Sequence, residues 1–147
     1  MIRPFQLVDI ERLLQLFRWN TPQYFGEEEL AHFETFLRSA PTDFYVMEVD
    51  AIIVGCAGFA YQKDTCTGQV SWFVFHPEYQ GRGLGRQILN FCLDQLGKHQ
   101  EMQKVIVRTS QLVEGFFSKA GFKTTYIEKD YWAPGYDLYL MEQRYPR

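Results

Sequence analysis

Residues that could cross-link the chain or hold a metal ion are scarce in this sequence. It has three cysteines and three histidines in 147 residues. Cys56, Cys66 and Cys92 form no close pair, so we expect neither a disulfide framework nor a zinc knuckle. The histidines lack the i, i+4 spacing and the neighbouring carboxylates of a metal site. We therefore predict no metal, and we interpret Cys56 and Cys92, which lie in apolar runs, as buried core residues.

Long apolar runs and blocks of like charge are missing as well. No stretch approaches the roughly 18 consecutive apolar residues of a membrane span, and the first residues do not resemble a signal peptide. Fifteen Lys and Arg against eighteen Asp and Glu give a net charge of -3, without a basic run for nucleic acid or a membrane surface. We expect a cytoplasmic protein whose partner is a small molecule or another protein.

What the sequence does contain is enough apolar material for one core. Hydrophobic residues make up 46% of the chain and aromatic residues 17%, in a length that suits one domain better than two. No internal repeat, low-complexity tract or linker interrupts it. The prediction is a single domain over residues 1–147.

Hydrophobic spacing in the first half of the chain changes from a helical period to a period of two. Asp9 can cap the first helix, and three glutamates lead the second. Asp50-Ala51 is a tight-turn position between two strands. The expected elements are a strand over Ile2 to Leu7, a helix from Asp9 to about Asn20-Thr21-Pro22, a helix over residues 27–38, and a hairpin of residues 44–49 and 52–61.

The second half predicts alternating strands and helices. Gly97 and Gly121 are plausible helix stops, and three successive apolar residues at 105–107 predict a strand buried on both faces. The expected elements are strands over residues 68–75, 104–108, 122–128 and 136–142, helices from about Gly83 to 96 and over 112–120, and a turn over 129–135. The order βααβββαβαββ describes one α/β (α+β) domain with helices packed on a sheet.

The most specific segment joins the strand that ends near Phe75 to the next helix. It reads His76-Pro77-Glu78-Tyr79-Gln80-Gly81-Arg82-Gly83-Leu84-Gly85. Closely spaced glycines let the main chain approach an anion, and the first N–H groups of a helix point at it with the positive end of the helix dipole behind them. The pattern predicts a diphosphate held by main-chain donors.

Two other diphosphate fingerprints do not match. A phosphate-binding loop requires Gly-Lys-Ser/Thr, whereas Gly85 is followed by Arg86-Gln87. A dinucleotide fingerprint that starts at Gly81 needs a glycine at position 86, and no acidic residue stands out about twenty residues later. A nucleotide-binding domain is therefore the weaker alternative.

Residues 80–85 resemble the main signature of the GNAT superfamily of acyl-CoA-dependent N-acyltransferases, Gln/Arg-x-x-Gly-x-Gly/Ala. A second segment of that family, a variation on Asn-x-x-Ala-x-x-Phe-Tyr-x-Lys-x-Gly-Phe, is similar to Ser110 through Phe122. The resemblance implies a mixed, mostly antiparallel sheet of about six to seven strands flanked by about four helices. It also implies that the strands at 68–75 and 104–108 splay apart to form a CoA cleft. Since relatives often dimerise, a homodimer stays open.

The same resemblance implies transfer of an acetyl group from acetyl-CoA to a primary amine of a small molecule, amino acid, peptide or protein, by direct attack in a ternary complex. Main-chain groups of Phe73, Val74 and Phe75 would pair with the pantetheine arm, and an N–H near Val74 or Phe75 would polarise the thioester carbonyl. The remaining cofactor contacts would come from Gln80, Gly81, Arg82, Gly83, Leu84, Gly85, Arg86, Ser110 and Phe117.

Two positions depart from the family pattern. Many relatives carry a tyrosine that protonates the departing thiolate where this chain has Phe117, and the usual Asn is Ser110. Three readings remain open. Another hydroxyl substitutes, or the thiolate leaves with water as its acid, or the domain is a non-catalytic acyl-CoA-binding sensor or regulatory module. The second is feasible because a thiol has a pKa of about 8.5.

The general base is also not where many relatives carry it, because residues 68–72 contain no carboxylate. An amine needs a base since its conjugate acid has a pKa of about 10.4. We predict Asp130 as the base or amine-anchoring carboxylate and Tyr131 as the substitute acid, with Glu114, Asp137 or a water chain as other candidate bases. Asp130 could instead only cap its turn. Trp72 and Trp132 are candidates for an acceptor pocket or for plain core.

Overall fold

The structure is a computed structural model that describes residues 1–20 and 27–146. Its elements follow the order predicted from the sequence, and the predicted helix stop at Thr21-Pro22 lies outside the described residues. The elements are β1 (Ile2–Pro4), α1 (Ile10–Asn20), α2 (Glu27–Arg38), β2 (Phe44–Val49), β3 (Ile52–Gln62), β4 (Thr67–Phe75), α3 (Leu84–Leu96), β5 (Lys104–Thr109), α4 (Glu114–Lys119), β6 (Lys123–Ala133) and β7 (Tyr136–Arg144).

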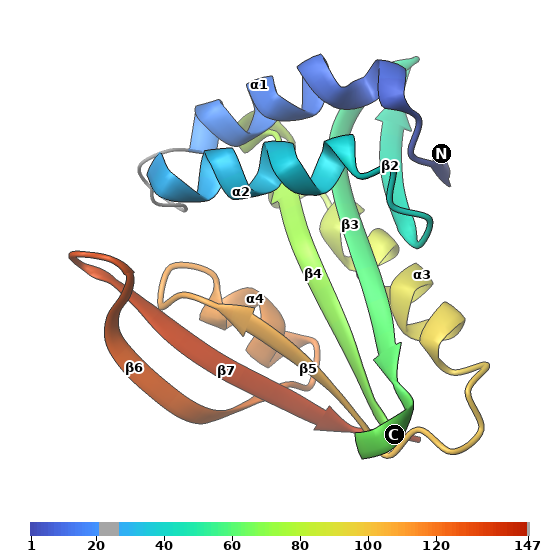
Figure 1. Ribbon diagram of the computed structural model, residues 1–147, viewed down its shortest axis with the longest axis vertical. Coiled ribbons are helices and arrows are strands. Elements are labelled where there is room, and N and C mark those ends of the chain that lie inside the picture. The colour runs from blue at the N-terminus through green and yellow to red at the C-terminus, as the bar shows by residue number, and fades with distance from the viewer. Residues whose placement is uncertain (21–26, 147) are drawn as a thin grey trace.

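All seven of these strands join one sheet in the order β1-β2-β3-β4-β5-β7-β6. Neighbouring strands are antiparallel except β4 and β5, which are parallel. Helices α1 and α2 lie on one side of β2, β3 and β4, and α3 lies on the other, while β5, β7 and β6 fan away from β4 (Figure 1). The expected mixed, mostly antiparallel sheet with flanking helices is confirmed.

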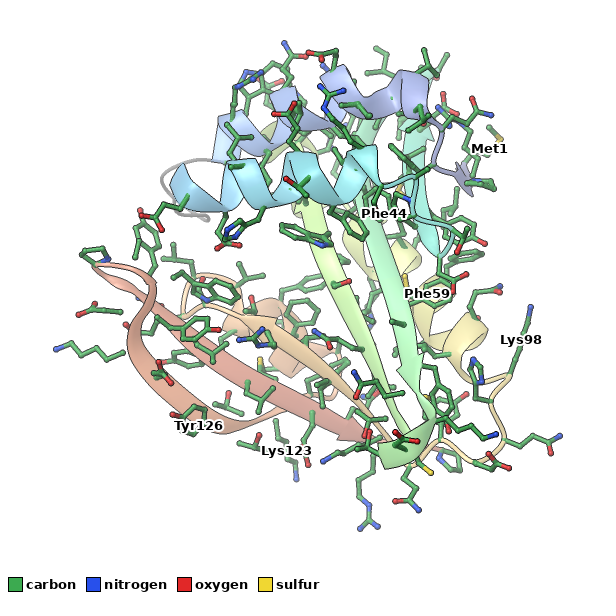
Figure 2. The ribbon with its side chains drawn as sticks, in the orientation of Figure 1. Met1, Phe44, Phe59, Lys98, Lys123 and Tyr126 are labelled. Carbon is green, nitrogen blue, oxygen red and sulfur yellow. The ribbon has the colours of Figure 1, made fainter. Side chains whose placement is uncertain are left out.

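Each face of the sheet carries its own hydrophobic cluster. Under α1 and α2, the rings of Phe17 and Phe33 stack at 5.0 Å and Phe33 meets Phe44 at 6.4 Å. Figure 2 shows Phe44 directly below α2. On the other face, α3 buries its apolar stripe against β3, β4 and β5. Cys56 and Cys92 lie fully buried in these clusters, as predicted, and burial raises the pKa of the Cys92 thiol to about 12.

Hairpin β2–β3 is confirmed, and its turn has the expected chemistry. Asp50 and Ala51 both adopt positive φ angles, 52° and 65°, as the two central residues of a type I′ turn must. Helix α2 matches its predicted bounds of 27–38, and α3 ends at Leu96, one residue before the predicted stop at Gly97.

Other predicted bounds are wrong. Strand β1 ends at Pro4 because residues 7–9 form a short 3-10 turn. The predicted helix over 112–120 begins at Glu114, since the Ser110 carbonyl accepts the N–H groups of Val113 and Glu114 and makes a separate turn. Strand β6 continues to Ala133 where a loop was predicted. Strand β5 is not buried on both faces, because Arg108 is exposed.

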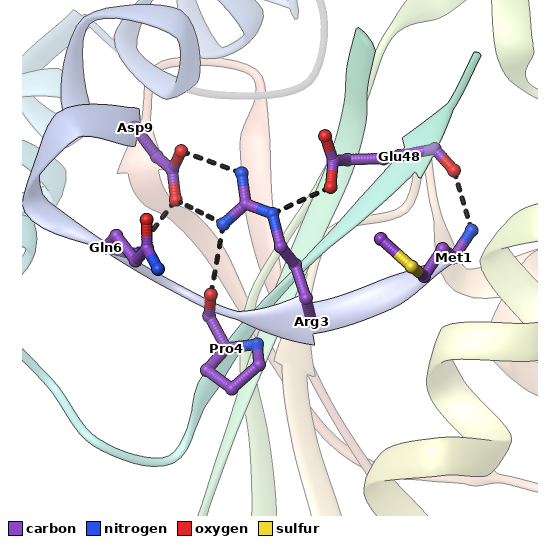
Figure 3. Close-up of polar contacts among 6 residues, drawn as sticks. All are labelled: Met1, Arg3, Pro4, Gln6, Asp9 and Glu48. Atoms are coloured by element: carbon purple, nitrogen blue, oxygen red, sulfur yellow. Dashed lines mark hydrogen bonds and ion pairs between the residues drawn. The ribbon is translucent and has the colours of Figure 1, made fainter. Parts of the chain in front are cut away.

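Asp9 does not act as the predicted helix cap and instead anchors the N-terminal strand. Its carboxylate accepts two hydrogen bonds from Arg3, each 2.9 Å long, and one from the Gln6 N–H (Figure 3). The Arg3 Nε also donates to Glu48 on β2 at 2.7 Å. Burial alone would raise the pKa of Asp9, but the Arg3 and Gln6 hydrogen bonds and the charge of Arg3 together hold it below its usual value.

Candidate active site

Strand β4 changes direction in its middle. Its pairing with β3 shifts register between Cys56 and Gly58, and the opposing residue Trp72 has a φ of 51°. This irregularity has the features of a β-bulge, which re-aims the side chains that follow it. Trp72 packs with the α1–α2 cluster, whereas Phe73 packs with the α3 cluster on the opposite face.

Strands β4 and β5 pair over only part of their length. Residues 67–70 pair with residues 104–107, and neither 71–75 of β4 nor 108–109 of β5 pairs across this boundary. Strand β5 continues beside β7 as far as Thr109. The two strands therefore splay apart after Val70 and Val107, and residues 71–75 of β4 have no strand partner on that edge within the described part of the chain.

A cavity of about 420 Å³ lies where the strands part. Its walls come from the β4 end, the glycine-rich loop, the start of α3 and the segment around α4. The lining residues are Asn20, Phe73, Phe75, Gln80, Gly81, Gly83, Gly85, Arg86, Leu112, Val113 and Phe116. The structure thus gathers Phe73, Phe75, Gln80, Gly81, Gly83, Gly85 and Arg86, which the sequence had assigned to a cofactor, around one cavity.

The loop between β4 and α3 presents main-chain donors to this cavity. Gly81 and Gly83 have φ angles of 79° and 80°, and a Cβ added to either would meet nothing within 4 Å. Among the described residues, no protein acceptor takes the N–H groups from Gly81 through Arg86. The first main-chain hydrogen bond of the helix is donated by the Gln87 N–H to the Gly83 carbonyl, at 3.2 Å. These donors stand at the N-terminus of a 13-residue helix, a geometry suited to phosphate.

The other predicted cofactor residues lie around this loop without lining the cavity. Val74 is buried on the α1–α2 side of β4, and the Arg82 guanidinium lies 4.7 Å from the centre of the Tyr79 ring. Ser110 accepts the Leu112 N–H through its Oγ at 3.2 Å. Leu84 begins α3.

Phe117 is 3% exposed and packs behind the cavity wall. Its ring lies 5.1 Å from Phe116 and 5.6 Å from Phe73, two of the three aromatic rings that line the cavity. The position therefore contributes packing. It holds no group that could donate a proton.

Asn20 is a site residue that the sequence reading missed. It is 2% exposed, and its Nδ2 donates to the carbonyls of Leu16 and Phe75, both at 2.8 Å. Its Oδ1 accepts a hydrogen bond of 3.4 Å from the Gln80 side chain. Asn20 thus ties the end of β4 to the β4–α3 loop. In the sequence it looks like an ordinary residue at the end of a helix, and only its partners show its role.

Asp130 lies near the end of β6, and its hydrogen bonds brace the turn at the tip of the β6–β7 hairpin. Its Oδ1 accepts the Gly135 N–H at 2.7 Å, and its own N–H donates to Asp137 Oδ1 at 2.9 Å. Gln111 fixes the same turn through Gly135 and Asp137, with bonds of 2.7 and 2.9 Å. The structure thus shows Asp130 capping this turn through a side-chain oxygen, which was one of the two roles considered for it. The second carboxylate oxygen, Oδ2, has no protein partner among the described residues.

Tyr131 and Trp132 adjoin this turn and hold the side chain of Arg108. The Arg108 Nη2 donates to the Tyr131 hydroxyl at 2.5 Å, and the guanidinium carbon lies 5.2 Å and 5.6 Å from the centres of the Tyr131 and Trp132 rings. The Trp132 indole N–H donates to the Thr109 carbonyl at 3.1 Å. Trp72, across the splay, instead stacks on Phe36 of α2 at 5.6 Å.

Metal-binding clusters and membrane-spanning helices are both absent from the described parts of the chain. No group of three or more His, Cys, Asp or Glu side chains is placed to hold a metal ion there. Nor does any helix in that range have the length and apolar character to cross a membrane.

Comparison with known proteins agrees with this geometry. Residues 40–124 match the family described as "Acetyltransferase (GNAT) domain", which is more than half of the chain. An N-alpha-acetyltransferase of Sulfurisphaera tokodaii is 28% identical over an alignment that covers 95% of this chain and 90% of the relative. The chain belongs to the GNAT family of acetyltransferases.

Solved structures share the fold. A GNAT-family acetyltransferase from Desulfovibrio desulfuricans has a TM-score of 0.81 at 18% identity, with 98% of each chain covered. The PaiA N-acetyltransferase from Thermoplasma acidophilum, solved in complex with coenzyme A, has a TM-score of 0.75 at 17% identity and covers 99% of this chain and 98% of its own.

Proposed function

We propose that this protein is an acetyl-CoA-dependent N-acetyltransferase that acts on a primary amine. The observation that carries the proposal is the row of N–H groups from Gly81 to Arg86, without protein acceptors among the described residues, at the edge of the cavity. Diphosphate chemistry suits such donors, because main-chain N–H groups at a helix N-terminus bind anions without help from side chains. The bare edge of β4 beside them suits an extended pantetheine arm.

The reaction proposed is direct attack of the amine nitrogen on the thioester carbonyl carbon. The C–N bond forms and the C–S bond breaks, while the nitrogen loses one proton and the sulfur gains one. A main-chain N–H near Val74 or Phe75 stabilises the negative charge that develops on the carbonyl oxygen. The residues of the loop and of β4 contribute chiefly by positioning the thioester.

Asp130 and Tyr131 are the residues we propose for proton transfer. Asp130 Oδ2 is free to accept the proton of the amine or to anchor it, while Oδ1 keeps the turn in place. The Tyr131 hydroxyl oxygen accepts from Arg108, so its own proton can go to the departing sulfur. Asp137 is the alternative base, since it too has one carboxylate oxygen in a main-chain hydrogen bond, from the Asp130 N–H.

The test is to mix the protein with acetyl-CoA and a panel of amines and to measure free thiol release. The panel should include peptides with free N-termini, since one relative is named an N-alpha-acetyltransferase, together with amino acids and simple diamines. Turnover with at least one amine is expected. CoA binding without turnover for any acceptor would instead favour an acyl-CoA sensor, which the buried Phe117 motivates, and absence of CoA binding would overturn both.

A further inference from the structure

Arg108 stands at the point where the sheet opens. It follows Val107, the last β5 residue paired with β4, and it pairs with Leu140 of β7. The Val107 side chain is buried in the α3 cluster, so the alternation of a strand puts Arg108 on the opposite face. That is the face on which Trp72 packs with α2. The guanidinium therefore borders the splay on the side away from α3.

The Arg108 side chain is held rather than left free in solvent. Its guanidinium lies against the rings of Tyr131 and Trp132, and one N–H donates to the Tyr131 hydroxyl. The Trp132 ring is fixed in turn by its bond to the Thr109 carbonyl. Such contacts remove much of the rotamer freedom that an arginine would lose on binding a ligand. The group is preorganised, and most of its donors remain available.

No carboxylate in the described parts of the chain pairs with this guanidinium, although the adjoining hairpin carries four. Among the described residues, none lies within 4.0 Å of Arg108, because each of the four has another partner. Glu128 accepts from the Tyr126 hydroxyl and Asp130 accepts from the Gly135 N–H. Asp137 accepts from the Asp130 main-chain N–H, and Glu142 accepts from Lys104. Arg3, by contrast, pairs with two carboxylates in the same structure.

We propose that Arg108 binds a carboxylate of the acceptor, so that the preferred substrate is an amine whose molecule also carries a carboxylate. This inference rests on the proposed function and adds the substrate class. A planar guanidinium pairs with a carboxylate through two parallel hydrogen bonds, which sets the orientation of the partner as well as its charge. The carboxylate could be the α-carboxylate of a free amino acid or an acidic side chain near the N-terminus of a peptide.

The test compares matched acceptors that differ only in this charge. The first pair is each of several L-amino acids and its α-carboxamide. The second pair is the C-terminally amidated peptides Ser-Glu-Ser-Ser and Ser-Gln-Ser-Ser. For the wild-type protein, kcat/KM is expected to be about 10- to 100-fold higher for the carboxylate member of at least one pair. Which pair shows the preference identifies the source of the carboxylate.

Arg108→Met also removes the hydrogen bond to Tyr131, a loss that acts on both acceptors alike, so the readout is the ratio of their kcat/KM values. That ratio should fall by about 10- to 100-fold, to near one. Arg108→Lys, which keeps the charge without the planar fork, should restore part of it. The matched control is Arg12→Met, because Arg12 also lies over a tryptophan ring, at 5.1 Å, but on α1. It should leave the preference intact.

A purely structural role for Arg108 predicts a different result. The hydrogen bond to Tyr131 would then only hold the β6–β7 hairpin in place. Arg108→Met would lower kcat/KM equally for both members of each pair and leave the preference unchanged. That result, or a wild-type preference near one in an active enzyme, overturns the inference and leaves the proposed function standing. Absence of turnover with every amine overturns the proposed function and the inference together.

Discussion

The two sides of the site are built from different parts of the chain. On the proposed cofactor side, the glycine-rich loop and the end of β4 line the cavity, and the loop presents its main-chain N–H groups. On the proposed acceptor side, the chemistry belongs to side chains on β5 and on the tip of the β6–β7 hairpin. A site built from main-chain groups constrains the sequence chiefly where the backbone needs glycine at a positive φ angle. A site built from side chains can change its chemistry by single substitutions. This difference explains why the glycine-rich segment matches the GNAT signature, whereas the residues available for proton transfer differ from those of many relatives.

The largest effect is expected at the loop. Gly83→Val should lower CoA affinity on the order of 100-fold or more. Gly83 has a φ of 80°, which a branched residue rarely adopts, and the added side chain would fill the open space that the diphosphate needs. Titration calorimetry with CoA measures the affinity. Gly135→Val is the matched control, with a φ of 83° and equally open surroundings but a place in the β6–β7 turn. Unchanged CoA affinity in a folded Gly83→Val protein would show that the loop assignment is wrong.

The next effect tests the side-chain half of the comparison. Asp130→Asn keeps an oxygen that can accept the Gly135 N–H, so the turn should persist, but it removes the proposed base. We expect kcat/KM to fall about 100-fold near neutral pH. The loss should be greatest at low pH, where fewer amine molecules are already deprotonated. A pH profile parallel to that of the wild type would remove Asp130 from the mechanism.

A smaller effect is expected where Asn20 ties the ends of α1 and β4 to the loop. Asn20→Leu leaves the Phe75 carbonyl without its buried donor, which should cost about 1–3 kcal/mol in unfolding free energy and weaken CoA binding about tenfold. Urea unfolding and CoA titration measure the two quantities. Gln143→Leu is the matched control, since Gln143 is a buried amide that donates to the Ala120 carbonyl away from the cavity. Equal CoA affinities in the two variants would contradict a positioning role for Asn20.

The smallest effect on the site is expected from the N-terminal ion pair. Asp9→Asn should lower the unfolding free energy by about 1–2 kcal/mol at neutral pH and leave CoA affinity unchanged. The folded-state pKa of Asp9 is depressed, so its contribution is present above the unfolded value of about 3.9 and is lost as the pH falls through the lower folded value. Urea unfolding from neutral pH downward should show the wild type and the variant converging. A pH-independent difference would exclude the charge as its cause.

Much of the fold, and the position of the loop that lines the cavity, could be predicted from the sequence because their signals are local. Helical periodicity set α2 to its observed bounds, and glycine spacing marked the loop. The misses involve partners far apart in the chain. Asp9 pairs with Arg3 instead of capping α1, and Asn20 meets Phe75, 55 residues away. The predicted loop at 129–133 belongs to β6 despite its turn-like composition, because Ala133 pairs with Tyr136 of β7 and the Asp137 carboxylate accepts the Asp130 N–H.

The acceptor side resisted prediction for a related reason. The sequence predicted Arg108 as the end of a buried strand. Its guanidinium instead packs against the rings of Tyr131 and Trp132, which belong to another strand, β6. The sequence did single out Tyr131 and Trp132, but it could not show that they hold a cation. Side-chain sites of this kind depend on tertiary contacts that spacing does not encode.

The most direct measurement of the central claim is an amide NMR titration of the protein with CoA. If main-chain donors hold the diphosphate, the N–H resonances of residues 81–86 should show the largest shifts, with smaller shifts for residues 73–75 of β4. Saturation by CoA with those amide resonances unmoved, and others moved instead, would contradict it.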